Sequence, residues 1–591
     1  MNKSSSGKSR LLPSWVVGLL AVMTLLLFAN SWQNPLILDD LVKVVNNSDI
    51  RNMDRIGDTL IYPYGATPTR NRNDPSRPLV SLVHTVVYHF WSAHPVPYHI
   101  VNTVIHFGNG ILVFLLISFF SKNIYASLSM ALLFLLLPIQ AGVAIYVYSL
   151  SDLLSSFFIL LAFYSFVRRK SEPAISSEVQ QGDKVKSILK SPLVVVCYIL
   201  ALASKQTGIV LPLLLGLYEI SSFSWILEAP HKTHGHEAEQ KFKNKMKQVA
   251  RSLLPLIVVT LIYLGFRYFY LGGIGDLEGF QQIHESMSYL SVQGMVILKY
   301  IQLTFIPVGL TIDHGILPNE YSGSFLFFCW TVVVAMGILG SSLIRTISPT
   351  KKIIGFGILF YLAVVLPTSL LPTVDCLVER RVYLANFGLL IVASSLFRNK
   401  SWVKSRNWKI SAAICLLLLY FVVSFKRNEV FASERQIWEE SLSSYPGYSR
   451  ALINAAWIFV TEKEYERGEE ILKIVLKYMP NNTEVLAKLG TLYGLDGFRK
   501  KDPNVALSYF QQATQINPGY FIGRYLAANV LVKLRRLKEA KETLQKVIET
   551  NKNYSPAYLL LGRIAEVEKD PTLAQFYFKS ARQIDPQDKP F

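Results

Sequence analysis

Two adjacent acids, Asp39 and Asp40, follow the first long apolar run of the chain in the stretch NPLILDD, residues 34–40. A carboxylate at such a boundary can take a proton from a hydroxyl group, and a pair of carboxylates can hold a divalent metal ion. Adjacent side chains on an extended segment point to opposite sides, so we expect only one acid to face a cleft, with Asp40 slightly favoured. The alternative is that the pair marks the water boundary or caps a helix that begins near Leu41.

Three cations at comparable boundaries are candidates for binding a phosphate group. Lys205 stands between two apolar runs in ALASKQTGIVLP, and Arg380 and Arg381 are adjacent in VERRVYLANFGLL. A phosphate that leaves during a reaction needs positive charge to stabilise it as its bond breaks. Arg380 is the stronger candidate because a guanidinium holds phosphate through two parallel hydrogen bonds. Snorkelling toward water or a structural ion pair is the alternative for each cation.

Histidines are concentrated in residues 84–106, where His99 and His106 are seven residues apart and share a helix face. Such a pair could bind a metal ion, but no third ligand has suitable spacing, and the four cysteines are scattered. We expect neither zinc nor a disulfide framework, and the identity of any metal stays open, with Mg²⁺ or Mn²⁺ as the divalent candidates. A further histidine cluster, HKTHGHEAE at residues 231–239, lies in a basic loop and is interpreted as a solvated linker.

The apolar content of the chain predicts a membrane protein with many spans. Of 591 residues, 51% are hydrophobic, and the mean hydropathy of +0.31 is too high for an ordinary soluble protein. The first run follows basic residues and lacks a small-residue cleavage site, which predicts a retained anchor with a cytosolic N-terminus. Eleven candidate spans lie near residues 11–31, 98–120, 124–138, 150–167, 192–204, 207–222, 252–271, 324–344, 353–372, 382–397 and 410–425.

The net charge of +19 is better explained by orientation in a membrane than by nucleic-acid binding. Basic residues cluster in short loops near 168–190, 232–251, 345–352 and 398–409, which all fall on the inner side if the N-terminus is cytosolic. Three long segments then lie outside: 32–97, 271–323 and everything beyond 427. Residues 288–315 could cross once, but a crossing there would invert every later basic loop. We therefore expect an interfacial or re-entrant helix in that stretch.

After residue 427 the sequence becomes polar and repeats with a period of 34 residues. Pro480 follows Pro446 after 34 residues, Pro518 follows after 34 plus an insertion of four, and Pro586 follows after twice 34. Small residues keep the same phase, so the pattern resembles the tetratricopeptide repeat, whose paired helices touch through small side chains. We predict four repeats over residues 447–586, a capping helix through ERQIWEESLSSYP, and a loop insertion at LDGFRKKDP.

Several motifs occur in order along the chain and carry a family resemblance. They are LDDLVKVVNN, RPLVSLVHTVVYHFW, PYHIVNTVIHFGNGILVFLL, LLPIQAGVAIYVYSLSDLLSSFFILLAF, ALASKQTGIVLPLLLGLYEI and VERRVYLANFGLL, followed by the repeats. This succession resembles the transmembrane and tetratricopeptide-repeat-containing O-mannosyltransferases and their bacterial relatives, members of the C-type glycosyltransferase superfamily. The resemblance implies that a sugar passes from a polyprenyl phosphate or diphosphate carrier to an acceptor on the outer or lumenal face. It also implies that an acid of the first outer loop is catalytic.

The resemblance suggests roles for further residues, and two motifs depart from the family pattern. Lys205 matches a Ser-Lys-Glu stretch in which Gln206 replaces the usual acid, while Glu379 and Arg380 match a Glu-Arg-Tyr-Leu-Tyr type motif. Asp152 in YSLSDLLSS corresponds to a Gly-Arg-Ala-Asp motif, but serine and leucine replace its arginine and alanine, which suggests a different donor contact.

Two residues near the first outer loop are expected to support the site. Arg77 would brace the loop, and His99 opens the next span.

The sequence thus predicts an all-α protein with a membrane domain, residues 1–426, and an extracytoplasmic repeat domain, residues 427–591. Its predicted function is inverting transfer of a sugar from a polyprenyl-phosphate donor to a protein hydroxyl group, with the repeats presenting the acceptor. One alternative has a glycan or lipid acceptor, and another is a non-catalytic membrane scaffold whose repeats bind protein partners. The predicted partners are the donor, the acceptor and membrane lipids, with no nucleic acid. A bacterial inner membrane is favoured over the endoplasmic reticulum because several motif positions are altered.

Overall fold

The structure is a computed structural model that describes residues 12–47, 49–51, 53, 57, 74, 76–171, 192–222, 235–270, 286–316, 320–373, 375–398, 406–447, 449–497 and 499–584. Every regular element within these ranges is a helix. Contacts divide the chain into two compact units, Met1–Ser433 and Glu434–Phe591, and each is described by itself. The division comes after residue 426 because the last helix of the first unit, α15, continues to Val430. The predicted architecture, an apolar helical bundle followed by a solenoid of paired helices, is confirmed.

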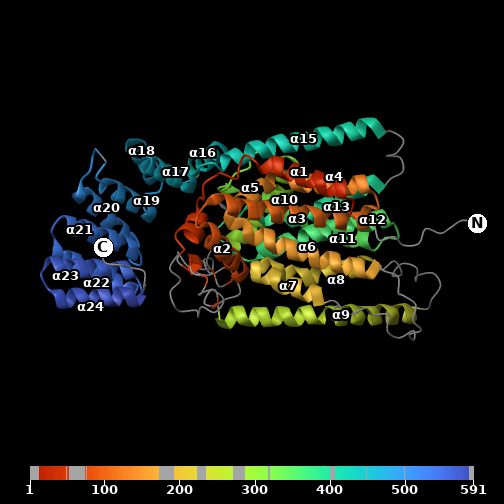
Figure 1. Cartoon of the computed structure of the whole chain (residues 1–591), viewed down its shortest axis with the longest axis horizontal. Coiled ribbons are helices and arrows are strands. Elements are labelled where there is room, and N and C mark those ends of the chain that lie inside the picture. The colour runs from red at the N-terminus through yellow and green to blue at the C-terminus, as the bar shows by residue number, and fades with distance from the viewer. Residues whose placement is uncertain are drawn as a thin grey trace, which may run out of the picture. The chain divides into compact units, whose positions relative to one another are not determined.

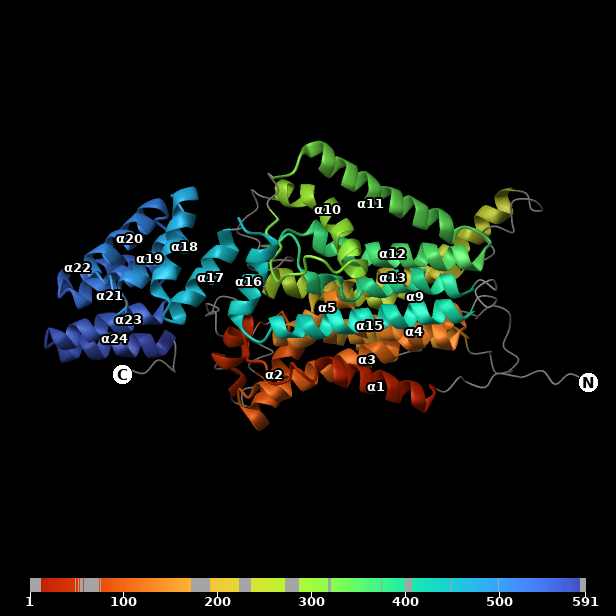
Figure 2. The same cartoon turned by 90° about the horizontal axis from the view of Figure 1, so that it is seen from above.

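Most helices of the first unit run roughly parallel to one another (Figures 1 and 2). They are α1 (Ser14–Phe28), α2 (Pro78–Trp91), α3 (Pro95–Ser121), α4 (Ile124–Leu136), α5 (Pro138–Ile145), α6 (Leu150–Ser171), α7 (Pro192–Ser204), α8 (Leu211–Ser222), α9 (Gly235–Tyr270), α10 (Ser286–Phe305), α11 (Gly323–Ile344), α12 (Pro349–Leu370), α13 (Ala385–Ser394) and α15 (Arg406–Val430). Short helical turns connect some of them, namely η1 (Leu41–Val45), η2 (Asp49–Arg51), η5 (Val147–Ser149), η7 (Gln206–Val210), η11 (Glu379–Val382) and η12 (Ser395–Arg398).

Several of these helices have the length and apolar character of membrane spans. Six such helices occur in the described part of the chain, or up to seven if the bent pair of α4 and α5 is one span. Four shorter apolar helices lie in α1, α7, η7–α8 and α13–η12, and all these segments together coincide with the eleven predicted runs. Helix α10 is not among the candidate spans. The first unit is therefore a multi-pass membrane domain.

The bend between α4 and α5 was not predicted from the sequence. The two helices meet at 61°, and the break falls at Leu137, whose φ of −60° and ψ of 120° are extended. Pro138 explains the break, because a proline disfavours helical backbone in the residue before it. The bend gives α5 a course of its own at the end of the bundle where α2 also lies (Figures 1 and 2).

Glycines allow close helix crossings inside the bundle. A Cβ atom on Gly357 of α12 would lie 2.6 Å from the carbonyl oxygen of Gly388 on α13, and one on Gly355 would lie 2.6 Å from that of Gly340 on α11. Small residues at such crossings let backbones approach where apolar burial alone does not favour one helix partner over lipid. The three helices are thus packed backbone to backbone.

The C-terminal end of α15 fastens the segment that follows α1. Asn428 donates to the Leu27 carbonyl at 2.6 Å and to Asn30 Oδ1 at 3.1 Å, and Asn34 donates to the Asn428 carbonyl at 3.3 Å. These bonds join residues about 400 positions apart in sequence. They fix where the first outer segment leaves the bundle.

The second unit consists of one leading helix and four helical hairpins. The leading helix is α16 (Glu434–Ser444), and the hairpins are α17 (Ser449–Thr461) with α18 (Tyr465–Tyr478), α19 (Thr483–Tyr493) with α20 (Pro503–Ile516), α21 (Phe521–Lys533) with α22 (Leu537–Thr550), and α23 (Ser555–Val567) with α24 (Pro571–Ile584). The predicted insertion occupies the loop between α19 and α20. The other three hairpins turn through Lys463, Arg535 and Lys569, each in the left-handed conformation.

Small residues lie where the helices of a hairpin touch, as the repeat pattern predicts. A Cβ atom on Gly468 of α18 would approach the carbonyl oxygen of Ala456 on α17 to 2.8 Å. Ala506, Ala513 and Ala540 are fully buried in the corresponding contacts of later hairpins. Larger side chains at these positions would separate the paired helices.

We predict that Gly468→Ala loosens the first hairpin. The added methyl group would lie 2.6 Å from the Val460 side chain and 2.8 Å from the Ala456 carbonyl oxygen. Because the backbone oxygen cannot rotate away, the cost should exceed the helix propensity that alanine gains and leave a net loss of about 1–2 kcal/mol. Hydrogen exchange of α17 and α18 in the intact chain should then accelerate by roughly 5- to 30-fold. Gly447→Ala is the matched control, because a Cβ atom there has no neighbour within 4 Å. Equal exchange in the two variants would contradict the packing role of Gly468.

Candidate active site

The first outer segment places Asp39 and Asp40 in different surroundings. Asp39 is exposed, whereas only 1% of Asp40 is accessible to solvent. The residue before them, Leu38, has a φ of 53°, a left-handed conformation that costs roughly 1–2 kcal/mol. The π-helical turn η1 begins directly afterwards at Leu41. The segment is thus a turn entering a helix, not the extended chain we expected, and the two acids still differ in exposure.

Asp40 is held by backbone donors. Its Oδ1 accepts a hydrogen bond from the N–H of Tyr148 at 2.7 Å, and its Oδ2 accepts one from the N–H of Ile37 at 3.5 Å. The side chain makes no capping bond to η1, although the helix does begin at Leu41. Burial raises the pKa of Asp40 to about 8, against the lowering effect of the backbone bonds. Asp40 therefore links the first outer segment to η5 and is largely protonated at neutral pH.

Asp39 lies within electrostatic reach of a cation. Its backbone N–H donates to the hydroxyl group of Tyr146 at 3.0 Å, which sets the position of the residue. Burial lowers the pKa of Arg380, but nearby Asp152 and, to a smaller extent, Asp39 contribute to raising it overall. Of the two acids, Asp39 is thus the one that combines exposure with proximity to Arg380.

Two guanidinium groups approach the ring of Tyr148 in η5. The Arg77 Cζ lies 5.5 Å and the Arg380 Cζ 5.7 Å from the ring centroid, within the range of cation–π attraction. Arg77 also donates to the Tyr148 hydroxyl group at 3.1 Å and forms an ion pair with Asp74 at 3.4 Å. The structure thus brings Arg77 and Arg380, far apart in sequence, to one tyrosine.

Lys205 and Asp152 form a buried ion pair beside these arginines. The Lys205 Nζ and the Asp152 Oδ1 are 2.5 Å apart, and each residue is less than 10% exposed. Burial and, to a smaller extent, the charges of Arg77 and Arg380 lower the pKa of Lys205 to about 8, against the raising effect of Asp152. Among the described residues the second oxygen, Asp152 Oδ2, has no hydrogen-bond partner. Asp152 therefore pairs with Lys205, lies within electrostatic reach of Arg380, and keeps one oxygen without a hydrogen bond in the described structure.

Polar side chains on one face of α3 fix the segments that carry this cluster. The His99 Nε2 bonds with the Asn34 carbonyl at 2.9 Å, and Asn102 donates to the Tyr146 carbonyl at 3.2 Å. Farther along the helix, the His106 Nδ1 and the Asn109 amide bond with the hydroxyl group of Tyr383 at 2.7 and 3.1 Å. His99 and His106 share a face, as predicted, but each binds a different partner and holds a separate part of the fold.

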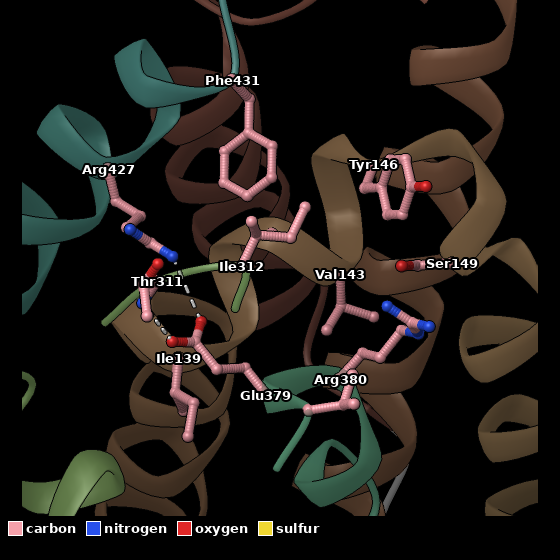
Figure 3. Close-up of a pocket in the computed structure, with 12 residues that line it drawn as sticks. Ile139, Val143, Tyr146, Ser149, Thr311, Ile312, Glu379, Arg380, Arg427 and Phe431 are labelled. Atoms are coloured by element: carbon pink, nitrogen blue, oxygen red, sulfur yellow. Dashed lines mark hydrogen bonds and ion pairs between the residues drawn. The ribbon is translucent and has the colours of Figure 1, made fainter. Parts of the chain in front are cut away.

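Glu379 turns away from Arg380 toward another set of partners. Its Oε1 accepts from the Thr311 N–H at 2.7 Å and lies 3.0 Å from the His314 Nε2, while its Oε2 lies 3.3 Å from Arg427. Thr311, Glu379 and Arg427 border a cavity of about 340 Å³, open solvent included. Figure 3 shows the guanidinium groups of Arg427 and Arg380 on opposite sides of it. The lining residues are Ile139, Gly142, Val143, Tyr146, Ser149, Thr311, Ile312, Val378, Glu379, Arg380, Arg427 and Phe431.

The hydrogen bonds of Arg381 go to residues other than those around Tyr148. It donates to the Asp375 carbonyl at 2.9 Å and to the Thr373 hydroxyl group at 2.8 Å. Thr373 in turn lies 3.2 Å from the hydroxyl group of Tyr289 on α10. The structure therefore gives Arg381 bonds that brace the loop between α12 and η11.

Within the described ranges, no three side chains of His, Cys, Asp or Glu lie close enough together to hold a metal ion. Asp40, one of the two acids considered as ligands, already accepts two backbone N–H groups. We therefore assign no step to a metal.

Sequence reasoning missed several residues of this region. Tyr146 and Tyr148 connect the acids to the arginines, and Arg427 and His314 hold Glu379. The tyrosines stand in the motif IYVYSLSD, directly after α5, and Arg427 follows the last apolar run. Their position, as polar or aromatic residues at the end of an apolar run, could have marked them in the sequence. Their partners could not be identified without the fold.

Comparisons with known proteins agree with the resemblance found in the sequence. Residues 498–564 match the family model of the tetratricopeptide repeat. The chain is 22% identical to Protein O-mannosyl-transferase TMTC3 of Homo sapiens, over 93% of this chain and 62% of that protein. It is 23% identical to Protein O-mannosyl-transferase TMTC4 of Mus musculus, over 73% of this chain and 62% of that protein. The chain is thus similar, over most of its length, to proteins named as O-mannosyl-transferases.

These matches cover only part of the length of the relatives. The chain spans about three fifths of the length of these O-mannosyltransferase relatives. Among solved structures, the crystal structure of MamA matches 27% of this chain and 91% of its own, at 20% identity and a TM-score of 0.24. This structural likeness is too low to bear on function.

The burial of Asp40 predicts a pH dependence of stability. Because its pKa is raised to about 8 from 3.8, the folded chain keeps a proton that the unfolded chain loses between these values, so this residue's contribution to stability falls as pH rises through that window. The effect is at most about 1.4 kcal/mol per pH unit. Asp40→Asn should flatten the decline of the apparent melting temperature between pH 5 and pH 8, measured on the full chain in detergent. Parallel profiles for the variant and the parent chain would contradict the assigned burial.

Proposed function

We propose that the chain is a membrane glycosyltransferase that moves one sugar from a polyprenyl-phosphate donor to a hydroxyl group of a protein. The observation that carries this proposal is the exposed carboxylate of Asp39 beside the cations around Tyr148, at the end of a helical bundle. Two relatives named as protein O-mannosyl-transferases support both the reaction class and a protein acceptor. They also make mannose the first sugar to test.

The proposed reaction is a single displacement with inversion at the sugar. The acceptor oxygen attacks the anomeric carbon, and Asp39 takes the proton of that hydroxyl group. The bond between the anomeric carbon and the phosphate oxygen breaks, and the electron pair leaves with the polyprenyl phosphate. A base within hydrogen-bonding reach and a cation at the leaving oxygen are the two groups that such a displacement needs.

Asp39 is preferred over Asp40 as the base because the base must touch the acceptor. Asp40 is 1% exposed and both of its oxygens accept backbone N–H groups, which suits a positioning residue. Its raised pKa is the one observation that favours Asp40, since a base works best when its pKa is near the working pH. Parallel variants of the two acids therefore decide between them.

The cations are assigned to the leaving phosphate. Arg380 is partly exposed at the first cavity and can present two N–H groups to phosphate oxygens. Lys205 lies beside this arginine in an ion pair with Asp152, and Arg77 holds Tyr148 in place. The apolar residues of the same cavity, including Val143, suit the first isoprene units of the carrier.

The repeats are assigned to the acceptor protein. Tetratricopeptide arrays bind extended peptides on their concave face, so the second unit is suited to hold an acceptor segment. A glycan or lipid acceptor, with the repeats recruiting other proteins, is the alternative for the same chemistry. A non-catalytic scaffold remains the non-enzymatic alternative, and it requires no function of Asp39.

The decisive test is Asp39→Asn in a transfer assay. Loss of the base should lower the rate of mannose transfer from the polyprenyl-phosphate donor to peptide hydroxyl groups by roughly 10²–10⁴-fold, while the chain still folds and binds donor. Asp49→Asn, an acid of the same outer segment, is the matched control and should keep full activity. An unchanged rate in Asp39→Asn would refute the assignment.

Asp40→Asn completes this test. Loss of a positioning residue should lower the transfer rate less than loss of the base does. The activity that remains in Asp40→Asn should still depend on Asp39. If Asp40→Asn abolishes transfer while Asp39→Asn remains active, the two roles are reversed.

The orientation of the bundle gives an independent prediction. If the acids act on the outer face, a cysteine placed at exposed His94 should react with a membrane-impermeant maleimide in right-side-out vesicles. A cysteine at Ile347, exposed in the turn between α11 and α12, should react only after permeabilisation. The opposite labelling pattern would place the chemistry on the cytosolic side and overturn the predicted topology.

A further inference from the structure

A second cavity lies on the other side of Arg77 and has a polar lining. Its volume is about 340 Å³, open solvent included. Of its described lining residues only Val80 is apolar. The polar groups include Lys43, Asn47 and Ser81, and the ring of Tyr148 forms part of the wall. This composition suits a ligand rich in hydroxyl groups.

His84 of α2 lines this cavity with a ring nitrogen that lacks a hydrogen-bond partner in the described structure. The residue is 3% exposed, and within the described part of the chain its Nε2 has no hydrogen-bond partner. Its ring packs edge-on against Tyr98, with ring centroids 5.9 Å apart. Burial lowers the pKa of His84 to about 4, so the ring is neutral near pH 7 and its Nε2 can donate to or accept from a neutral hydroxyl group. A buried polar atom without a partner costs free energy, which a bound ligand can recover.

Asp74 supplies an ionised acceptor at the same cavity. Burial raises its pKa, but Arg77 and two hydrogen bonds from Ser76 lower it below the usual value overall. A carboxylate braced in this way can accept hydrogen bonds from sugar hydroxyl groups, while the face of an aromatic ring offers a platform for the apolar face of a sugar. Asp74 forms an ion pair with Arg77, and Lys43 adds a second cation to the lining.

The two cavities have complementary linings and a shared border. The first combines apolar residues with Arg380 and Arg427, whereas the second is almost entirely polar. Tyr148 lines the second cavity, and the Arg380 guanidinium that borders the first lies 5.7 Å from its ring centroid. A donor that joins an isoprenoid phosphate to a sugar has these same two halves.

We propose that the second cavity binds the sugar of the donor, a neutral hexopyranose, with His84 hydrogen-bonded to one of its hydroxyl groups. This inference rests on the proposed function, because it places the two halves of one donor. In this arrangement Asp74 and Asn47 take other hydroxyl groups and Tyr148 packs against the ring. The phosphate lies at Arg380, between the cavities, and the anomeric carbon is then close to Asp39.

The test compares two carriers on the full chain in lipid nanodiscs. The probes are polyprenyl phosphate bearing mannose and the same polyprenyl phosphate without a sugar. His84→Leu, which removes the ring nitrogens but keeps an apolar side chain, should weaken binding of the mannosyl carrier by roughly 3- to 10-fold and leave the sugar-free carrier unchanged. Arg380→Ala should weaken both carriers. His89→Leu on an exposed position of the same helix is the matched control and should change neither.

The outcomes separate this inference from the proposed function. If the unaltered chain binds neither carrier, the proposed function itself fails. If it binds both, and His84→Leu affects them equally or not at all, the sugar pocket is refuted while the function stands.

Two further measurements exclude a merely structural effect of the histidine. His84→Gln keeps a side-chain donor and should recover most of the affinity for the mannosyl carrier. A set of carriers bears mannose that lacks one hydroxyl group at a time. One of these deoxy sugars should bind the unaltered chain more weakly than mannose does. The same deoxy sugar and mannose should bind His84→Leu equally well. If every deoxy sugar loses the same factor in both chains, no hydroxyl group is bound by His84 and the inference is overturned.

Discussion

Three cations, Arg77, Lys205 and Arg380, lie near Tyr148 and repel one another. Asp152 offsets part of this repulsion, and the arrangement of the region depends on that offset. Groups of like charge do not gather in a poorly solvated place unless a counter-charge offsets them. Asp152 supplies much of that offset through a 2.5 Å contact with Lys205, yet one of its oxygens makes no hydrogen bond in the described structure. An anion whose charge grows during a reaction would meet the Arg380 guanidinium, which borders the first cavity. The exposed carboxylate of Asp39 lies within electrostatic reach of the same guanidinium.

The site is built from breaks in helices at one end of the bundle. Pro138 bends the path after α4, Lys205 separates α7 from η7, and η11 follows the loop after α12. Each break leaves backbone N–H or C=O groups without helical partners, which is tolerated within a membrane protein only where other groups satisfy them. Side chains do so here: Asp40 accepts from the N–H of Tyr148, Asn102 donates to the carbonyl of Tyr146, and the Tyr300 hydroxyl group bonds with the backbone of Val378 at 2.9 Å. The same bonds that satisfy the breaks hold the reactive groups in position.

The second unit obeys a different physical rule. Its helices pair with their neighbours in sequence, and each hairpin adds a similar layer through small residues such as Gly490 and Gly562, which face Phe510 and Phe578. Such stacks depend on local contacts, so an insertion between α19 and α20 is accommodated without changing the pairing. The membrane unit instead depends on contacts between residues hundreds of positions apart, such as Asn34 and Asn428. This contrast explains why the repeat region could be predicted from the sequence down to single loops.

The sequence by itself determined the apolar runs, the 34-residue repeats and the identity of the acids and cations at run ends. These features depend on composition and periodicity, which are local. Only the tertiary structure decided how neighbouring side chains diverge: Asp40 is buried while Asp39 is exposed, and Arg380 faces Tyr148 while Arg381 braces a loop. Glu379, the neighbour of Arg380 in the sequence, pairs with Arg427. The reason is physical, because the direction of a side chain in a turn follows from backbone angles such as the positive φ of Leu38 and from partners that only folding brings near.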